Sequence, residues 1–199
     1  MDLEPTSRTR HVLVIRRGAG DDRRVDDTVL VEGPLEIIVD AVSVATTMRT
    51  PGDDDLLAIG FSICEGLIPD GCEPVVEVEV TDGDGARVLV TTGNLFPQQT
   101  GRLGLVSSSC GVCGTADLPG LIASVPPVAP STNFDVSTLV GVAGSARALQ
   151  ELFTLTGGSH AAAAFTSDGQ IVAVAEDVGR HNAVDKVIGR LHLDGRLPA

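Results

Sequence analysis

The stretch "TPGDDDLLAIGFSICEGLI", residues 50–68, predicts a helix whose two ends are marked in the sequence. Thr50 is expected to cap the helix, Pro51 suits its first position, and Asp53 completes a Thr-x-x-Asp capping box. Gly66 is a natural C-terminal stop. Apolar residues recur on one face at helical spacing: Leu56, Ile59, Ile63 and Leu67. Because strand patterns flank this helix, the sequence indicates an α/β fold.

The flanking strand patterns lie on both sides of the helix. Before it, "TVLV" and "LEIIVDAVSVATTM" are rich in β-branched residues and break at Gly33-Pro34 and near an Asp-Ala pair. After it, "PVVEVEVTDGDGARVLVTT" alternates on both sides of Asp-Gly-Asp-Gly. That alternation predicts a β-hairpin.

The second half of the chain predicts two helices around another hairpin. The first helix runs from about Ser137 to Phe153 and ends at Gly157-Gly158. "HAAAAFTSDGQIVAVAED" is the hairpin, and "GRHNAVDKVIGRL" is the second helix. The first helix is expected to bury Leu139, Val142, Ala146, Leu149 and Phe153. The second is expected to bury Ala183, Val184, Val187, Ile188 and Leu191.

These patterns divide the chain into three parts. We expect residues 1–24 to form an Arg-rich, partly disordered tail. Residues 25–128 are predicted to form an N-terminal α+β lobe that carries a Cys-x-x-Cys loop. A Pro-rich stretch, "LPGLIASVPPVAPST", then connects to a second lobe over residues 132–199.

The composition excludes several classes of protein. With 199 residues and 43% hydrophobic content the chain predicts a folded core, and its formal net charge of −13 argues against general nucleic-acid binding. No stretch approaches the roughly 20 apolar residues of a membrane-spanning helix. The start, "MDLEPTSRTR", has no apolar signal region, so we expect a cytoplasmic protein without membrane contact. Lys186 is the only lysine.

Two of the four cysteines lie three residues apart in "SSSCGVCG", residues 107–114. Cys110 and Cys113 could hold half a zinc site, exchange disulfides or carry sulfur. Zinc needs four ligands, and the spacing of Cys64 and Cys72 does not supply a second pair, so no metal is expected. No lysine or arginine lies within seven residues of Cys110 to activate a thioredoxin-like thiolate. A thiol on a loop suits a sulfur relay, whereas Cys64 is interpreted as a small buried side chain and Cys72 as an ordinary loop residue.

Four blocks of the sequence together resemble one family. They are "GPLEIIVDAVSVATTMRTPGDDDLLAIGFSICEGLI", "SSSCGVCGTADL", "LFTLTGGSHAAAAF" and "EDVGRHNAVDKVIG". From about Val29 to Gly189 they are similar, in order, to the blocks of the formate dehydrogenase accessory sulfurtransferase family, FdhD. A lone Cys-x-x-Cys would be a weak signal, but the second and fourth blocks together are highly specific. The resemblance implies that the second lobe is a layered α/β lobe similar to cytidine deaminase, without the deaminase zinc site.

The resemblance also implies sulfurtransferase activity. Such proteins take sulfane sulfur from a cysteine desulfurase and pass it to the molybdenum cofactor, in its bis-guanine-dinucleotide form, before insertion into formate dehydrogenase. Carried over, Cys110 is expected to bear the persulfide, with Cys113 as its partner, and the protein is expected to be a homodimer. A cofactor escort that transfers no sulfur, and a dithiol oxidoreductase, remain the alternatives.

The fourth block favours an anionic ligand on physical grounds. It places Arg180, His181, Asn182 and Lys186 at the start of a helix, whose N–H groups favour phosphate. The cofactor that the resemblance implies carries such phosphates, so these residues are its predicted contacts, and His160 in the third block is a further candidate.

The chain departs from the family in two places. Asp40-Ala41 stands where a glycine would usually complete the turn. The chain also stops at "LHLDGRLPA", whereas family members continue for several dozen residues. We therefore expect an incomplete second lobe that exposes apolar surface.

Overall fold

The computed structural model describes residues 7–17, 22–69, 71–93 and 133–197, together with the backbone of residues 104–106. In chain order the elements are β1 (Thr9–Arg16), β2 (Arg23–Leu30), β3 (Gly33–Val39), β4 (Val42–Arg49), α1 (Asp54–Cys64), β5 (Val75–Val80), β6 (Ala86–Thr91), β7 (Gly104–Val106), α3 (Val136–Ala148), α4 (Glu151–Thr156), β8 (His160–Phe165), β9 (Ile171–Asp177) and α5 (Arg180–Leu193). The prediction of a mixed α/β fold is confirmed.

The largest sheet has five strands in the order β5-β6-β3-β4-β7. The pairs β3–β4 and β5–β6 are antiparallel, whereas β3–β6 and β4–β7 are parallel. The hairpin predicted around Asp-Gly-Asp-Gly is therefore confirmed, and β3 and β4 form a second hairpin at the expected break. Asp40 and Ala41 form the β3–β4 turn with positive φ angles of 43° and 67°. Alanine is strained there, since the left-handed region favours glycine.

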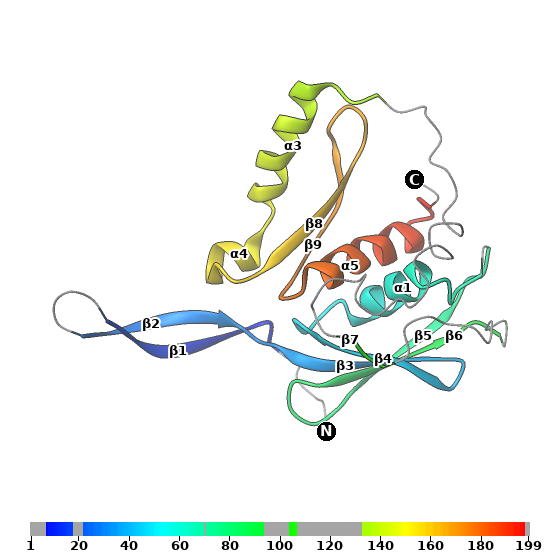
Figure 1. Ribbon diagram of the computed structural model, residues 1–199, viewed down its shortest axis with the longest axis horizontal. Helices are drawn as coiled ribbons and strands as arrows, with labels where there is room; N and C mark the ends of the chain where they lie inside the picture. The colour runs from blue at the N-terminus through cyan, green and yellow to red at the C-terminus, as the bar shows by residue number, and fades with distance from the viewer. Residues whose placement is uncertain (1–6, 18–21, 70, 94–103, 107–132, 198–199) are drawn as a thin grey trace.

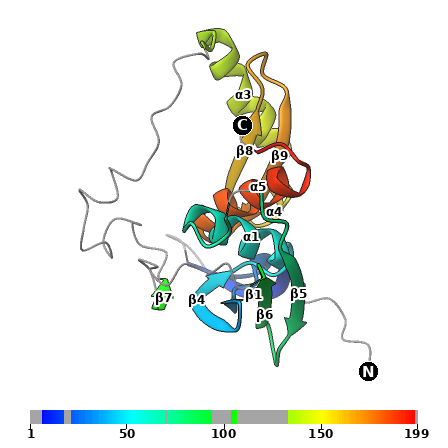
Figure 2. The same ribbon diagram turned by 90° about the vertical axis from the view of Figure 1, so that its right-hand side faces the viewer.

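The molecule is built as a stack of layers on this sheet (Figures 1 and 2). Along β3 and β6, buried apolar residues alternate with more exposed ones, and the buried face packs against α1. On the exposed face, a hydrogen bond from Arg87 lowers the pKa of the Glu36 carboxyl. Helix α5 lies against the other side of α1, and the β8–β9 hairpin lies on α5. Because both its sides are covered, α1 is buried over most of its surface.

Two glycines let α1 and α5 approach backbone to backbone. A Cβ added at Gly60 would lie 1.8 Å from the carbonyl oxygen of Asp185, and one added at Gly189 would lie 2.1 Å from that of Leu56. No side chain fits at either distance, so the glycines set the spacing between the two helices.

The start of α1 differs from the prediction. The helix begins at Asp54, and its N-cap residue is Asp53, which has a left-handed conformation and makes no side-chain capping bond. The expected capping box from Thr50 is therefore wrong. Thr50 is fully buried and its polar groups bond to residues of β9 and α5 instead.

The predicted helix over residues 137–153 is two helices. The chain leaves helical geometry at Gln150, and the buried carboxylate of Glu176 accepts hydrogen bonds from the backbone N–H groups of Leu152 and Phe153, both at 2.8 Å. Because these two N–H groups donate to Glu176, they do not donate to carbonyl groups of α3. Helix α3 therefore ends before them, and α4 begins there. Asp135 caps α3 by accepting from the N–H of Ser137, which lowers the pKa of the Asp135 carboxyl.

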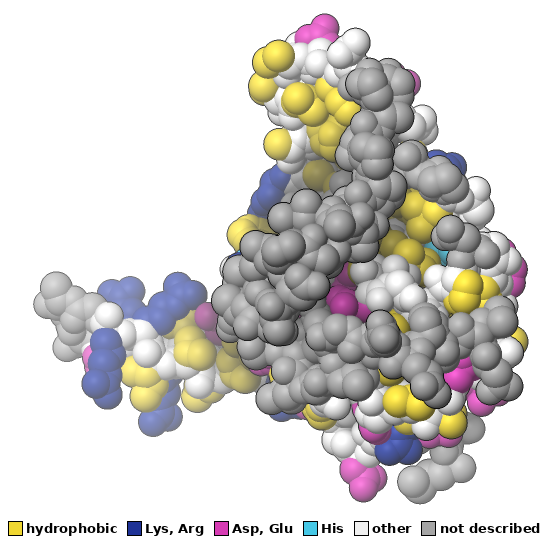
Figure 3. Space-filling view, turned by 45° about the vertical axis from the view of Figure 1, so that its right-hand side comes forward, with side chains coloured by type: hydrophobic (Ala, Val, Ile, Leu, Met, Phe, Trp, Pro, Cys, Tyr) yellow, Lys and Arg dark blue, Asp and Glu magenta, His cyan; other side chains and the backbone are white. Residues whose placement is uncertain are grey.

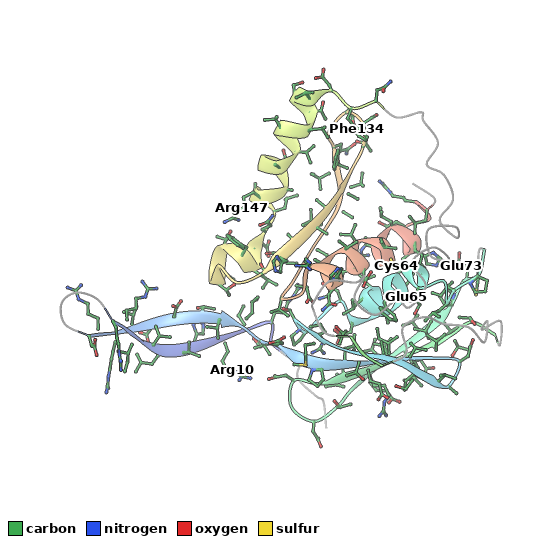
Figure 4. The ribbon with its side chains drawn as sticks, viewed as in Figure 1. Arg10, Cys64, Glu65, Glu73, Phe134 and Arg147 are labelled. Carbon is green, nitrogen blue, oxygen red and sulfur yellow. The ribbon has the colours of Figure 1, made fainter. Side chains whose placement is uncertain are left out.

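The apolar stripe predicted for this region is mostly exposed. Val142 is the buried residue of α3, whereas Leu139 and Leu149 are 45% and 52% exposed. Phe134, at the start of α3, makes an edge-to-face contact with Phe165 near the hairpin tip (Figure 4). The expected exposure of apolar surface in this lobe is confirmed.

Three further predictions are corrected. Residues 9–16 and 23–24 belong to the antiparallel β1–β2 hairpin, not to a partly disordered tail. Cys64, at the C-terminal end of α1, is exposed and not buried (Figure 4). Val184 is exposed as well, while the polar Asn182 and Lys186 are buried on its helix. Cys72 packs partly against the main core.

Replacing Gly60 by alanine is expected to lower the free energy of unfolding by about 2 kcal/mol, because the added methyl group forces α1 and α5 apart. Gly144→Ala is the matched control, since Gly144 lies in exposed helix α3 with no atom near the new Cβ. That change should raise the same free energy by about 0.5–1 kcal/mol. Urea denaturation of the wild type and both variants measures these free energies of unfolding. A neutral or stabilising Gly60→Ala would contradict the close helix contact.

Candidate functional site

The carboxylate of Asp177, the last residue of β9, is the centre of a buried polar network. Its side chain is 0% exposed and accepts four hydrogen bonds. Oδ2 accepts from the Nζ of Lys186 at 2.8 Å and from the backbone N–H of Thr50 at 3.1 Å. Oδ1 accepts from the backbone N–H of Gly179 at 2.8 Å and from Nδ2 of Asn182 at 2.9 Å. A carboxylate needs this number of donors to remain charged in a dry interior.

Lys186 is as deeply buried as Asp177. Its Nζ also donates to the carbonyl oxygen of Thr50 at 3.1 Å, so Thr50 contacts both members of the ion pair. In addition, the Oγ1 of Thr50 accepts from the N–H of Val178. The segment that enters α1 is thereby bonded to the segment that enters α5.

Asn182 extends the network to β4. Its Nδ2 donates to the carbonyl oxygen of Met48 at 2.8 Å, and its Oδ1 accepts from the Oγ1 of Thr47 at 3.3 Å. We call Thr50, Asp177, Gly179, Asn182 and Lys186 the Asp177 network. It joins the end of β4, the end of β9 and the start of α5 over more than 120 residues of sequence separation.

A second buried ion pair lies on the same side of α1. Arg49 donates from Nε and Nη2 to the two carboxylate oxygens of Asp54, both at 2.8 Å, and from Nη1 to the carbonyl oxygen of Asp84. Arg49 is 1% exposed. This bidentate pair fixes the first turn of α1 to β4, immediately beside Thr50.

The structure separates the five predicted cofactor contacts into two groups. Lys186 and Asn182 are buried, and their polar groups bond to protein atoms, which differs from the phosphate-binding role predicted for them. Arg180, His181 and His160 are exposed. His160 pairs directly with Asp177 in the β8–β9 register, so these three residues, which we call the exposed basic set, lie at the same end of the hairpin.

The start of α5 favours an anion. Its N-cap residue, Gly179, carries no side chain to cap the helix. Within the described part of the chain, the backbone N–H groups of Arg180 and His181 meet no acceptor. A helix of 14 residues has a positive N-terminal end, and an exposed arginine there adds a full charge. The Asp177 network holds this end of the helix in place.

Cys110 and Cys113 lie outside the described residues. The nearest described element before them, β7, pairs in parallel with β4, and Val106 lies opposite Thr47. Val106 therefore lies beside Thr47, the residue that donates to Asn182.

Metal-binding clusters and membrane-spanning helices are both absent from the described residues. No group of three or more His, Cys, Asp and Glu side chains there is arranged to hold a metal ion. No helix among those residues is long and apolar enough to cross a membrane.

The fold and this site define an α/β protein with a buried carboxylate–lysine pair beneath an exposed anion-favouring helix start. Residues 30–199 match the model of the FdhD/NarQ family. The chain belongs to the FdhD/NarQ family.

Curated relatives bear out this membership. The sulfur carrier protein FdhD of Streptomyces avermitilis is 40% identical over 205 residues, which cover 95% of this chain and 71% of the relative. The protein of the same name from Sulfolobus acidocaldarius is 36% identical, covering 87% and 65%. A crystal structure of a formate dehydrogenase accessory protein from Desulfotalea psychrophila is similar in fold, with a TM-score of 0.69 and 21% identity over 96% of this chain and 71% of that one.

Sequence reasoning missed the residues that build the network. Asp177 and Glu176 both follow an apolar strand directly, and two acidic residues at a strand end are a weak signal for buried acceptors. Thr50 was assigned to a helix cap on a valid local pattern. Its true partners lie more than 120 residues away, where no local pattern can indicate them.

Proposed function

We propose that this protein is a sulfurtransferase that carries sulfur as a persulfide on Cys110 and delivers it to the molybdenum bis-guanine-dinucleotide cofactor. One observation carries the proposal: membership of a family whose curated relatives are named sulfur carrier proteins, in a chain that has a Cys-x-x-Cys pair. The sulfur donor is a cysteine desulfurase, and the sulfurated cofactor is destined for formate dehydrogenase. The proposed location is the cytoplasm.

Sulfur loading is a thiol–persulfide exchange. The thiolate of Cys110 attacks the outer sulfur of a cysteine persulfide on the donor, the donor's S–S bond breaks, and the donor leaves as a thiolate. In the transfer step the S–S bond breaks, both bonding electrons stay on Cys110 as a thiolate, and the outer sulfur leaves as neutral sulfur, which the reduced cofactor would convert to a sulfide ligand with two of its own electrons. Cys113 is proposed to assist as the second thiol of the pair.

The cofactor is the substrate, and the exposed basic set is its proposed contact. Its guanine dinucleotide parts carry phosphates, which suit an arginine and free N–H groups at a helix start. Lys186 and Asn182 support this contact from beneath, by holding the start of α5 against Thr50 and Met48. Their proposed role is therefore positioning of the helix, not contact with phosphate.

The end of β7, which precedes the cysteine pair in sequence, is connected to the start of α5 through Thr47. Strand β7 ends at Val106, four residues before Cys110, and four residues of chain span at most about 14 Å. Val106 pairs with Thr47, which donates a hydrogen bond to Asn182 in the first turn of α5. We therefore propose that Cys110 serves a ligand bound at the start of that helix.

Incubation with a cysteine desulfurase and cysteine is expected to add one sulfur, about 32 Da, to Cys110, and a reducing thiol should remove it, since a persulfide is a labile S–S bond. Mass spectrometry of the intact protein and its peptides measures the gain and its position. Cys110→Ser should abolish loading and formate dehydrogenase activation together.

Cys64→Ser is the matched control, because Cys64 is an exposed cysteine at the C-terminal end of α1 and outside the Cys-x-x-Cys pair. It should load normally. If sulfur maps to Cys64 or Cys72, the assignment of Cys110 is wrong. Activation that survives loss of both Cys110 and Cys113 would favour a cofactor escort, and reduction of insulin by the wild type would favour a dithiol oxidoreductase.

Arg180→Ala is expected to weaken binding of GDP, used as the probe for the cofactor's nucleotide part, by about tenfold, because a charge-assisted phosphate contact is lost. The difference should shrink as salt is raised. Arg190→Ala is the control, since Arg190 is exposed in the last turn of the same helix. Calorimetric titration measures both. Equal affinities for the two variants would remove Arg180 from the proposed site.

A further inference from the structure

The short segment between α4 and β8 carries His160 to its place in the exposed basic set. Its sequence, residues 157–160, is "GGSH". Gly157 ends α4 with a left-handed φ of 67°, and Gly158 follows it. Glycine restricts the backbone less than any other residue, so local forces define this segment only weakly. The position of His160 relative to the start of α5 therefore depends on the contacts that the segment makes.

Ser159 fixes this segment to β9. Its Oγ donates a hydrogen bond to Oε1 of Glu176 at 2.7 Å. Both residues are buried, each with 7% of its surface exposed. A hydrogen bond to a charged acceptor is roughly twice as strong as one between neutral groups, and it gains further where water is largely excluded. The residue directly before His160 is therefore firmly held.

The carboxylate that holds Ser159 is itself held by α4. Oε2 of Glu176 accepts from the backbone N–H of Leu152, and Oε1 accepts from that of Phe153, both at 2.8 Å. These donors lie at the start of the six-residue helix α4, whereas Ser159 follows its end. Glu176 therefore connects the start of α4 to its exit, and Ser159 is bonded to an acceptor whose own position is fixed.

The other contacts of the segment are weaker. The N–H of Gly158 donates to the neutral Oγ1 of Thr156 at 3.1 Å. On the outer side lies the β1–β2 hairpin, which projects from the body with its basic side chains (Figures 1 and 3). Its last residue, Leu30, would meet a Cβ added at Gly158 at 3.7 Å, an ordinary van der Waals distance. The bond from Ser159 is therefore the charge-assisted contact nearest to His160.

The end of β9 places both halves of the exposed basic set. Asp177 lies opposite His160 in the β8–β9 register, and its carboxylate holds the start of α5, which carries Arg180. Glu176 comes directly before Asp177 and holds the segment that carries His160. Two adjacent carboxylates thus fix His160 and Arg180 relative to one another.

We propose that Ser159 is a positioning residue: its bond to Glu176 holds His160 where the imidazole N–H donates to a phosphate of the ligand at the start of α5. The inference rests on the proposed function, in which that ligand is the guanine dinucleotide cofactor. Ser159 is buried and acts on the ligand only through His160. Since the segment is ordered before the ligand arrives, binding does not bear the cost of ordering it.

Calorimetric titration of the full chain with GDP tests the role of Ser159. Ser159→Ala should weaken GDP binding by about fivefold, because the segment that carries His160 must then be ordered on binding. Ser43→Ala is the matched control, since the hydroxyl of Ser43 also donates to a carboxylate, that of Glu36, at 2.8 Å in the β3–β4 hairpin. The control should bind GDP like the wild type. Equal affinities for the two variants would overturn the proposal.

A double-mutant cycle separates positioning of His160 from a general structural role. His160→Ala should weaken GDP binding, and adding Ser159→Ala to it should cause no further loss, because the two changes remove the same contact. A serine that merely stabilises the hairpin end would weaken binding by the same factor in both backgrounds. Additive losses, or a His160→Ala variant that binds like the wild type, would therefore overturn the proposal.

The same titrations distinguish this inference from the proposed function. A wild type that does not bind GDP would contradict the proposed cofactor site itself. A wild type that binds GDP and is weakened by His160→Ala but not by Ser159→Ala would leave that site standing and overturn only the role of Ser159. Melting temperatures of all variants, measured alongside, show that each is folded at the temperature of the titration.

Discussion

The buried contact between Asp177 and Lys186 is the interaction on which the rest of the structure depends. Both side chains are fully buried and 2.8 Å apart, and each supplies the other with an opposite charge inside the protein. Thr50 bonds to both. The pair therefore fixes the loop before α1 to the first two turns of α5, and these helices form the layer between the main sheet and the β8–β9 hairpin.

Two neighbouring carboxylates at the end of β9 organise different helices. Asp177 accepts hydrogen bonds from the backbone N–H of Gly179, at the start of α5, and from that of Thr50, in the loop before α1. Glu176 accepts from the backbone N–H groups of Leu152 and Phe153, at the start of α4. Successive residues of a strand point to opposite faces, so adjacent acids serve opposite sides of the hairpin. Helix starts supply unpaired N–H donors, and buried carboxylates satisfy them.

Much of the fold follows from local sequence patterns, but the centre of the site does not. The hairpins around residues 40, 83 and 168 and the helices α1 and α5 follow from periodicity and turn residues. Lys186 was predicted to contact the cofactor because it is the only lysine and lies near a helix start, whereas in the structure it is buried and paired with Asp177. Whether a lysine near a helix start meets a ligand or a buried aspartate is decided by tertiary contacts with Thr50, which periodicity does not encode.

Amide hydrogen exchange followed by NMR tests the central role of Asp177 most directly. Asp177→Asn keeps the shape of the side chain but leaves Lys186 without its counter-charge, so the amides of Thr50 and Gly179 should exchange at least about tenfold faster. The amides of Leu152 and Phe153 should be unchanged. Glu176→Gln, the adjacent change of the same chemistry, should give the reverse pattern. If both variants loosen the same amides, or if Asp177→Asn leaves those of Thr50 and Gly179 protected, the account of the Asp177 network is contradicted.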